Sequence, residues 1–354
     1  MTSRICSGLF ILVLVVVLGS AQAREPAQNA YRVVDRFPIG GPGGWDDLNL
    51  DPTSNRLFVS RFDRVVVLDA ASGKPLGTIP DTEGVHGIAL APDLGRGYTS
   101  NGHADSVTEF DLATLKVVRQ LGPTGKNPDA ILYDPFSRHV FTFNGHSDNA
   151  SVIDARSGKL VATIPLDGKP EFAVSDHRGH VYVNIEDKAE ITEIDSHSDK
   201  VLATWPLTGC EEPSGLAFDA VHRRLFPVCQ NQRMIVVDAG SGHVIASVPI
   251  GTGPDGAGFD SGRGLVFSSN GRDGTLTVVK EDDPDHFHVL ADVPTQKSAR
   301  TMALDPTTHR IYLSAATFGA MPAGADPREH KRPPMVPDSF TVLVVGNTTP
   351  AQRQ

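Results

Sequence analysis

The chain has 354 residues, of which 40% are hydrophobic and 21% are charged, and its formal net charge at pH 7 is −10. These proportions are ordinary for a folded globular protein. The acidic balance argues against a non-specific grip on nucleic acid, because lysine and arginine contacts with phosphates supply that affinity. We therefore do not expect nucleic acid as a partner.

Residues 1–23 are predicted to be an export signal. Arg4 provides a positive charge, residues 5–18 form an apolar stretch, and Ala21-Gln22-Ala23 matches a small-x-small cleavage pattern. The apolar stretch is short for a membrane span, and no later segment is apolar enough to form one. The sequence thus predicts a periplasmic or secreted protein with no membrane insertion after removal of the signal.

The rest of the chain repeats one phrase about every 42 residues. The phrase is an apolar residue and Asp, a turn that often reads Ser-Gly-Lys, an apolar strand, and then Pro and Gly. Its aspartate recurs in steps of 41 to 43 residues at Asp69, Asp111, Asp154, Asp195 and Asp238. A period in this range is typical of repeat folds.

Within each repeat, short β-branched runs bounded by turn residues predict strands, as in residues 57–60 and 65–68. There are seven units of about four strands each, which predicts an all-β fold, a seven-bladed β-propeller over residues 24–346. Residues 317–338 depart from the repeat and are expected to be a loop insertion in the last blade. Residues 347–354 read as a polar tail.

The way in which the ring closes can also be predicted. The last repeat has three strands and ends with residues 340–345, whereas residues 36–40 echo the fourth strand of an earlier repeat, residues 247–251. We therefore expect the N-terminal strand to complete the last blade, which removes exposed strand edges.

One repeat carries a family resemblance. Ile153-Asp154, Ser157-Gly158-Lys159 and Ile164-Pro165 resemble the YVTN-type repeat of YncE-like seven-bladed propellers, and the match covers residues 31–346. The resemblance implies an exported propeller. It implies no particular activity, since one relative is associated with DNA binding and many have none assigned. Function must therefore be argued from the residues of a site.

Aligning the repeats on the first turn of each blade predicts which side chains surround one mouth of the central channel. The positions five residues before this turn are Asp46, His86, Asp129, Pro170, Ser214, Asp255 and Arg300. Asp47 and Glu171 follow one residue later, and Trp45 lies beside them. The loops between second and third strands add Asn101, His103, Asn144, His146, Asn270 and Arg272.

Three of these loops contain Asn-Gly, at residues 101, 144 and 270. This dipeptide forms turns readily because it accepts left-handed backbone geometry, so turn formation is the simpler interpretation of the asparagines. The turn does not need the histidines that follow at His103 and His146.

The crowding of carboxylates at the mouth leaves two alternatives open. Like charges persist together where a cation, a proton or arginine offsets them. Oxygen ligands with asparagine would suit calcium, and histidine would shift the preference to zinc or another transition metal. The first alternative is a divalent metal ion held by Asp46, His86, Asp129 and Asp255. The second is a water-lined acidic mouth, balanced by Arg272 and Arg300, without a metal.

We expect a monomer that binds a small ligand, a metal ion or a partner protein at this mouth. The alternative is a metal-assisted hydrolase acting on a lactone, an ester or a sugar derivative, in which an ion activates water or paired acids transfer protons. A third interpretation is a scaffold whose channel holds only water. Trp45 either stacks on a sugar or aromatic ligand or plugs the channel. No catalytic motif identifies a nucleophile, so the catalytic residues are not assigned.

Two cysteines remain after removal of the signal, Cys210 and Cys229. An isolated pair in an oxidising compartment is most simply a disulfide. Cys210 precedes the first strand of its repeat and Cys229 ends the second, so both approach the same face of one blade. We expect them to be bonded.

Overall fold

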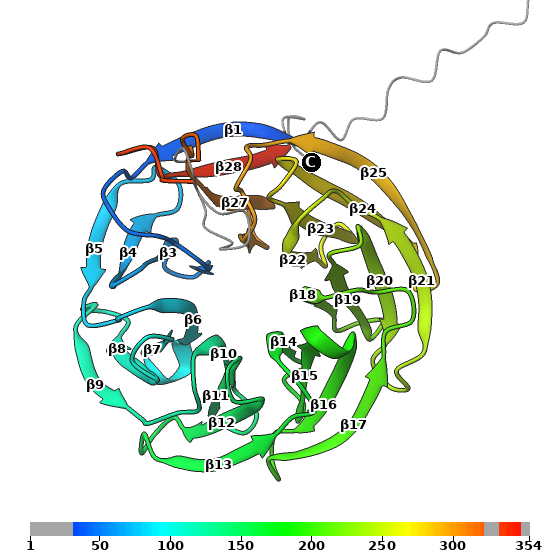
Figure 1. Ribbon diagram of the computed structural model, residues 1–354, viewed down its shortest axis with the longest axis horizontal. Helices are drawn as coiled ribbons and strands as arrows, with labels where there is room; N and C mark the ends of the chain where they lie inside the picture. Colours follow the sequence, from blue (N-terminus) through cyan, green and yellow to red (C-terminus); the bar gives the residue numbers. More distant parts are fainter. Residues whose placement is uncertain (1–30, 322–332, 348–354) are drawn as a thin grey trace, which may run out of the picture.

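The computed structural model describes residues 31–321 and 333–347. The predicted export signal and the tail from residue 348 lie outside the described residues. The described residues form seven four-stranded antiparallel sheets, which are arranged as blades around a central axis (Figure 1). The prediction of an all-β, seven-bladed propeller is confirmed.

The first six blades follow the chain in order, each running from the axis outward. Blade 1 consists of β2 (Leu48–Asp51), β3 (Arg56–Arg61), β4 (Arg64–Asp69) and β5 (Pro75–Ile79). Blade 2 consists of β6 (Val85–Ala91), β7 (Arg96–Asn101), β8 (Ser106–Asp111) and β9 (Val117–Leu121). Blade 3 consists of β10 (Pro128–Asp134), β11 (His139–Asn144), β12 (Asn149–Asp154) and β13 (Leu160–Pro165).

Blade 4 consists of β14 (Pro170–Ser175), β15 (His180–Ile185), β16 (Glu190–Asp195) and β17 (Lys200–Pro206). Blade 5 consists of β18 (Pro213–Asp219), β19 (Arg224–Cys229), β20 (Arg233–Asp238) and β21 (Val244–Pro249). Blade 6 consists of β22 (Pro254–Asp260), β23 (Leu265–Asn270), β24 (Thr275–Asp283) and β25 (His286–Pro294). Two single 3-10 turns, η1 (Pro92–Leu94) and η2 (Glu186–Lys188), lie in loops.

Blade 7 closes the ring as the sequence predicts. It consists of β26 (Met302–Asp305), β27 (Arg310–Ala315), β28 (Thr341–Asn347) and, outermost, β1 (Tyr31–Pro38). β1 pairs antiparallel with β28, with Phe37 opposite Val342. The strand β28 runs to Asn347, one residue past the predicted end of the domain.

The repeated phrase has a clear structural meaning. The middle strands are buried on both sides between neighbouring blades, so Leu57, Phe58 and Val59 in β3 are all fully buried. The repeated aspartate closes the turn that leads to the outer strand. In blade 1, the Asp69 carboxylate accepts hydrogen bonds from the amide and hydroxyl of Ser72 at 2.8 and 2.6 Å. The period therefore reflects one buried hairpin and one polar turn in each blade.

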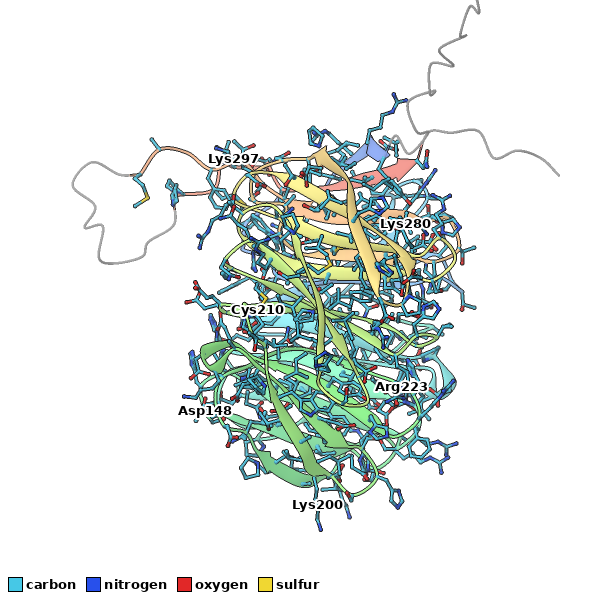
Figure 2. The ribbon with its side chains drawn as sticks, turned by 90° about the vertical axis from the view of Figure 1, so that its right-hand side faces the viewer. Asp148, Lys200, Cys210, Arg223, Lys280 and Lys297 are labelled. Atoms are coloured by element: carbon cyan, nitrogen blue, oxygen red, sulfur yellow. A yellow bond between two sulfur atoms is a disulfide. The ribbon has the colours of Figure 1, made fainter. Side chains whose placement is uncertain are left out.

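Two further features lie on the face of the ring that bears the loops between second and third strands. The disulfide between Cys210 and Cys229 is confirmed, with a Cα–Cα distance of 5.4 Å. The described ends of the 317–338 insertion pair with each other through Phe318 and Met335. Figure 2 shows Cys210 and Asp148 on this face and Arg223 and Lys280 on the opposite one. Among the described residues, no helix is long and apolar enough to cross a membrane.

Candidate functional site at the channel mouth

A cavity of about 860 Å³ opens at the end of the channel where the first strand of each blade begins. Ten of the predicted site residues line it: Trp45, Asp46, Asp47, His86, His103, Asp129, Glu171, Asp255, Arg272 and Arg300. The other four, Asn101, Asn144, His146 and Asn270, are not part of its wall. The volume lies within the range of small-molecule pockets.

A recurrent bulge aims the first-strand side chains into this cavity. The pairing of β6 with β7 shifts between Val85 and Ile88, and β10, β14, β18 and β22 shift at the same place. A bulge interrupts the regular alternation of side chains and redirects one of them. In each of these five strands the second residue lies in the bulge and lines the cavity. These residues are His86, Asp129, Glu171, Ser214 and Asp255.

The bulges correct one predicted position. The sequence alignment, counted back from the first turn, matches Pro170 with Asp129 and places Glu171 one residue later. In the structure, Pro170 begins the pairing of β14 with β15 opposite Ile185, and Pro128 begins the pairing of β10 with β11 opposite Asn144. Pro170 is therefore the equivalent of Pro128, and Glu171 is the equivalent of Asp129. The offset arises because β14 has six residues and β10 has seven.

Three side chains from three consecutive blades form a compact group, which we call the mouth cluster: Asp46, His86 and Asp129. The Nδ1 atom of His86 lies 2.5 Å from Asp46 Oδ2 and 3.4 Å from Asp129 Oδ1. One donor atom from each residue lies within 4.8 Å of the other two. Imidazole nitrogen and carboxylate oxygen together are a ligand set that divalent transition metals accept.

Arg300 binds the other side of Asp46. Its Nη2 donates to Asp46 Oδ1 at 2.7 Å, and its Nη1 forms an ion pair with Asp255 Oδ2. The second oxygen of Asp255 accepts a hydrogen bond from the hydroxyl of Ser214 at 2.6 Å. Asp255, predicted as a fourth metal ligand, is therefore engaged by Arg300 and Ser214 and lies outside the mouth cluster. The cluster and the arginine-balanced acids of the second alternative occur side by side.

The three cluster residues differ in their affinity for protons. Burial would raise the pKa of Asp46, but the charge of Arg300 and the hydrogen bond with His86 lower it to about 2. Burial and the charge of Asp46 raise the pKa of Asp129 to about 6. Burial would lower the pKa of His86, yet its hydrogen bond to Asp46 and the charge of Asp129 raise it. Asp46 is thus the most acidic of the three groups, and His86 holds its proton more tightly than a free imidazole does.

A second charged group lies next to the cluster in blade 4. Lys169 Nζ lies 2.7 Å from Glu171 Oε1 and also pairs with Glu186. Burial and the charge of Asp129 raise the pKa of Glu171 to about 8, against the opposing effect of Lys169. Burial also raises the pKa of Asp47 well above its usual range. Burial thus raises the pKa of two carboxyl groups in the cavity wall.

The asparagines of the three Asn-Gly loops are structural, but not for the predicted reason. Each is buried and bridges the second and third strands of its own blade. For example, Asn101 accepts a hydrogen bond from Thr99 and donates one to Thr108, both at 2.8 Å. No residue of the three dipeptides has a left-handed backbone. The left-handed residues of these loops are Asp105, Asp148 and Gly274.

The glycines of two of these loops provide space for site residues. A Cβ atom on Gly102 would lie 2.7 Å from the ring of His86, and one on Gly271 would lie 2.6 Å from Cβ of Arg300. On Gly145 the nearest atom would be Cε of Lys169 at 3.5 Å, an ordinary contact. Close packing of loop backbone against the site thus requires glycine at 102 and 271.

Aromatic and histidine side chains form the outer part of the mouth. Trp45 packs against Phe318 and Phe340, with ring centroids 5.8 and 5.2 Å apart, and its indole N–H is buried without a hydrogen-bond partner among the described residues. His103 packs edge-on against Phe62 at 5.4 Å. His146 is exposed and lies away from the cavity. Trp45 is therefore part of the wall and leaves the channel mouth open.

Sequence reasoning missed several lining residues, among them Lys169, Glu186 and Gln230. Glu186 and Gln230 occupy the loops between second and third strands of blades 4 and 5. The rule that selected Asn101 and Asn144 would have found them if applied to every blade. Lys169 precedes its first strand, and no repeated feature of the sequence distinguishes it.

Comparison with known proteins identifies the fold. No protein-family model matches the chain, and no curated protein matches it by sequence. It is similar to a chain of Kuenenia stuttgartiensis hydrazine synthase, with a TM-score of 0.68 and 17% identity over 78% of this chain and 94% of that one. It is also similar to a chain of the mitotic checkpoint complex, with a TM-score of 0.69 and 14% identity over 87% and 96%. At such low identity, the likeness establishes a β-propeller and nothing about its ligand.

Proposed function

We propose that this protein is an exported, YncE-like β-propeller that binds a divalent metal ion, and with it a small polar ligand, at the mouth of its channel. The observation that carries the proposal is the mouth cluster. It brings donor atoms from three blades within 4.8 Å of one another on the wall of an 860 Å³ cavity. The export pattern at residues 1–23 and the disulfide support an oxidising compartment.

The spacing of the donor atoms is close to what an ion needs. Ligands about 2.1 Å from a tetrahedral zinc ion lie about 3.4 Å from one another. His86 Nδ1 and Asp129 Oδ1 are already 3.4 Å apart. His86 Nδ1 and Asp46 Oδ2 are 2.5 Å apart, and this pair separates when an ion replaces the proton between them.

The rest of the wall indicates the kind of ligand. Of the described cations that line the cavity, Lys169 pairs with Glu186 and Arg300 pairs with Asp46 and Asp255, whereas the exposed Arg272 makes no ion pair. Arg272 is thus available for an anionic group. Trp45, Phe172 and Phe318 offer apolar surface. A small molecule with one negative group and one apolar or sugar-like face fits this combination.

The second candidate function is a metal-assisted hydrolase of a lactone, an ester or a sugar derivative. The specific observation that favours it is Glu171, a half-buried carboxyl group in the same cavity, whose pKa of about 8 leaves it able to donate a proton at neutral pH. Arg272 is the group that would hold an anion, because Arg300 is bound to Asp46 and Asp255.

The test is the metal content of the full chain, exported and purified without chelator or histidine tag. Plasma mass spectrometry compares the wild type with His86→Ala and Asp129→Asn. The matched control is His103→Ala, which removes an imidazole from the same cavity outside the cluster. We expect both cluster variants to lose about one equivalent of metal and the control to keep it.

The opposite result is also informative. If the wild type takes up no metal even after reloading with zinc, manganese or calcium, the metal proposal is wrong. If metal binds, a screen of lactones and esters with the loaded protein distinguishes the two functions. Turnover that is lost in Glu171→Gln while metal is retained supports the hydrolase, and binding without turnover supports the ligand-binding function.

A further inference from the structure

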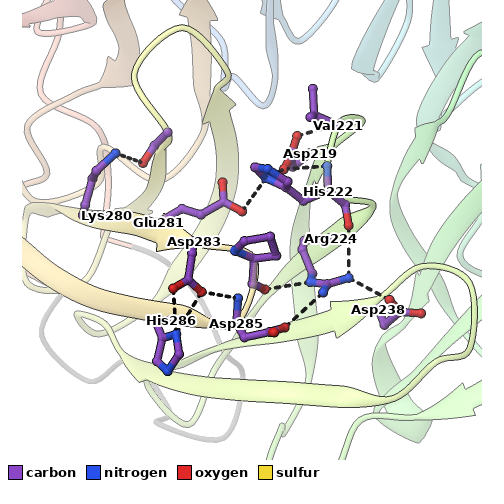
Figure 3. Close-up of polar contacts among 12 residues, drawn as sticks. Asp219, Val221, His222, Arg224, Asp238, Lys280, Glu281, Asp283, Asp285 and His286 are labelled. Carbon is purple, nitrogen blue, oxygen red and sulfur yellow. Dashed lines mark hydrogen bonds and ion pairs between the residues drawn. The ribbon is translucent and has the colours of Figure 1, made fainter.

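A second group of histidine and carboxylates lies on the opposite face, between blades 5 and 6. We call it the rim cluster: Asp219 at the end of β18, His222 in the following turn and Glu281 in β24. His222 Nδ1 lies 2.7 Å from Asp219 Oδ2 and 3.1 Å from Glu281 Oε1. Figure 3 shows the imidazole between the two acids. Their donor atoms lie within 4.8 Å of one another.

The two carboxylates are buried without a fixed cation. Asp219 is 1% exposed and Glu281 is 5% exposed. Asp219 accepts hydrogen bonds from the amides of Val221 and His222. Among the described residues, His222 is the one basic side chain that pairs with either acid. Burying two carboxylates against a single imidazole is costly, so the group favours a cation.

The neighbouring basic side chains are engaged elsewhere. Arg224 pairs with Asp238 and Asp285, as Figure 3 shows. Lys280 Nζ donates to the carbonyl of Arg263 at 2.8 Å and turns away from Glu281. Even a protonated His222 would balance only one of the two acids. The rim cluster therefore comprises two acids and one base.

The position of Glu281 recurs in other blades with a different residue. The amide of Glu281 donates to the carbonyl of Gly264, just as the amide of Ser196 in blade 4 donates to the carbonyl of Gly179. From this position the Ser196 hydroxyl reaches Asp134 of the preceding blade, and Glu281 reaches His222 in the same way. The junction of blades 6 and 7 shows the contrast, because there His309 contacts the single carboxylate of Asp260 at 2.7 Å.

We propose that Asp219, His222 and Glu281 bind a divalent transition-metal ion, with zinc as the representative, and that the ion joins blades 5 and 6. One imidazole and two carboxylates satisfy such an ion, and water completes its coordination on the exposed side of His222. The ion neutralises both acids. Because the ligands come from two blades, binding stabilises the ring.

The experiment uses the full chain in a His86→Ala background, which removes the mouth cluster. Chelator-treated protein is titrated with zinc, and bound metal is measured by equilibrium dialysis alongside thermal unfolding. We expect one equivalent of zinc to bind at the rim cluster and the Tm to rise by about 3 °C or more. Adding Glu281→Gln or His222→Ala abolishes both effects. Adding the control His309→Ala leaves them unchanged.

Several results would overturn the proposal. One is zinc binding and a Tm shift that persist in both Glu281→Gln and His222→Ala. Another is no uptake at micromolar zinc in the His86→Ala background. Since His222 is 40% exposed, its replacement tests the site even if Glu281→Gln fails to fold. The mouth cluster is absent throughout, so failure of the rim site and failure of the proposed function are distinguishable.

Discussion

The mouth cluster and the rim cluster use the same chemistry in different surroundings. In each, a histidine Nδ1 lies between two carboxylates that adjacent blades bring together. The mouth cluster opens on a cavity of about 860 Å³ and is held by Arg300. The rim cluster lies outside this cavity, and its acids are enclosed by blades 5 and 6.

Donor atoms alone therefore do not define a function, because the surroundings of the ion decide its effect. An ion at the mouth cluster leaves room for a ligand beside it, so its effect is recognition or chemistry. An ion at the rim cluster has blades on two sides, so its effect is on stability. The predictions below separate binding at the mouth from stability of the ring.

The largest expected effect is on stability. Replacing both Cys210 and Cys229 with alanine removes the covalent link in blade 5, and we expect the free energy of unfolding to fall by about 3 kcal/mol. Urea unfolding measures the loss, and mass spectrometry measures bound metal. Metal at the mouth cluster should remain, since neither cysteine contacts it. Loss of that metal in the folded variant would contradict the separation of the two regions.

The next effect concerns the fit of loop backbone against the mouth cluster. Gly102→Ala places a methyl group 2.7 Å from the ring of His86, and we expect metal affinity to fall about 10- to 100-fold, as for loss of a supporting contact. Gly145→Ala is the matched control, because the nearest atom to its methyl group is Cε of Lys169 at 3.5 Å, an ordinary contact. Zinc titration of both variants provides the comparison. Equal affinities would show that Gly102 does not position His86.

The smallest effect concerns Asp134, which occupies in blade 3 the place of Asp219 in blade 5. Burial would raise its pKa, but hydrogen bonds from Ser196, Ser175 and Ser137 outweigh burial and lower the pKa. We expect Asp134→Asn to lower the free energy of unfolding by about 1.5 kcal/mol at pH 7, a value usual for hydrogen bonds to a charged group.

This contribution depends on pH in a defined direction. Because the folded-state pKa of Asp134 lies below its usual value of 3.8, its stabilisation is present above pH 3.8 and is lost as pH falls through the folded-state pKa. The gap between wild type and Asp134→Asn in urea unfolding should therefore shrink at acid pH. A gap of the same size at pH 3 and pH 7 would show that ionisation of Asp134 is not the cause.

Most of the fold could be predicted because each repeat is a local unit. The turn at Asp69 and the buried run in β3 involve residues close in sequence, so their pattern recurs wherever the unit recurs. Closure of the ring was predicted from the count of strands in the last repeat. The disulfide followed from the place of each cysteine in its blade.

The candidate site could be predicted only in outline. Alignment of the repeats selected Asp46, His86 and Asp129, because equivalent first-strand positions converge at the axis. It missed the partnership of Arg300 with Asp255, which depends on side-chain direction rather than position. It also assigned Gly102 to turn geometry, whereas the structure uses its lack of a side chain to seat His86.

The sequence by itself determined the period, the number of blades, the closing strand and the residues that face one end of the channel, since these depend on local patterns repeated in register. Only the tertiary structure decided which of those residues touch. The one-residue difference between β14 and β10 and the bulges set side-chain directions. Contacts between blades join residues about 40 apart in the chain at the mouth, such as Asp46 with His86, and about 60 apart at the rim, such as His222 with Glu281. No local pattern encodes those distances.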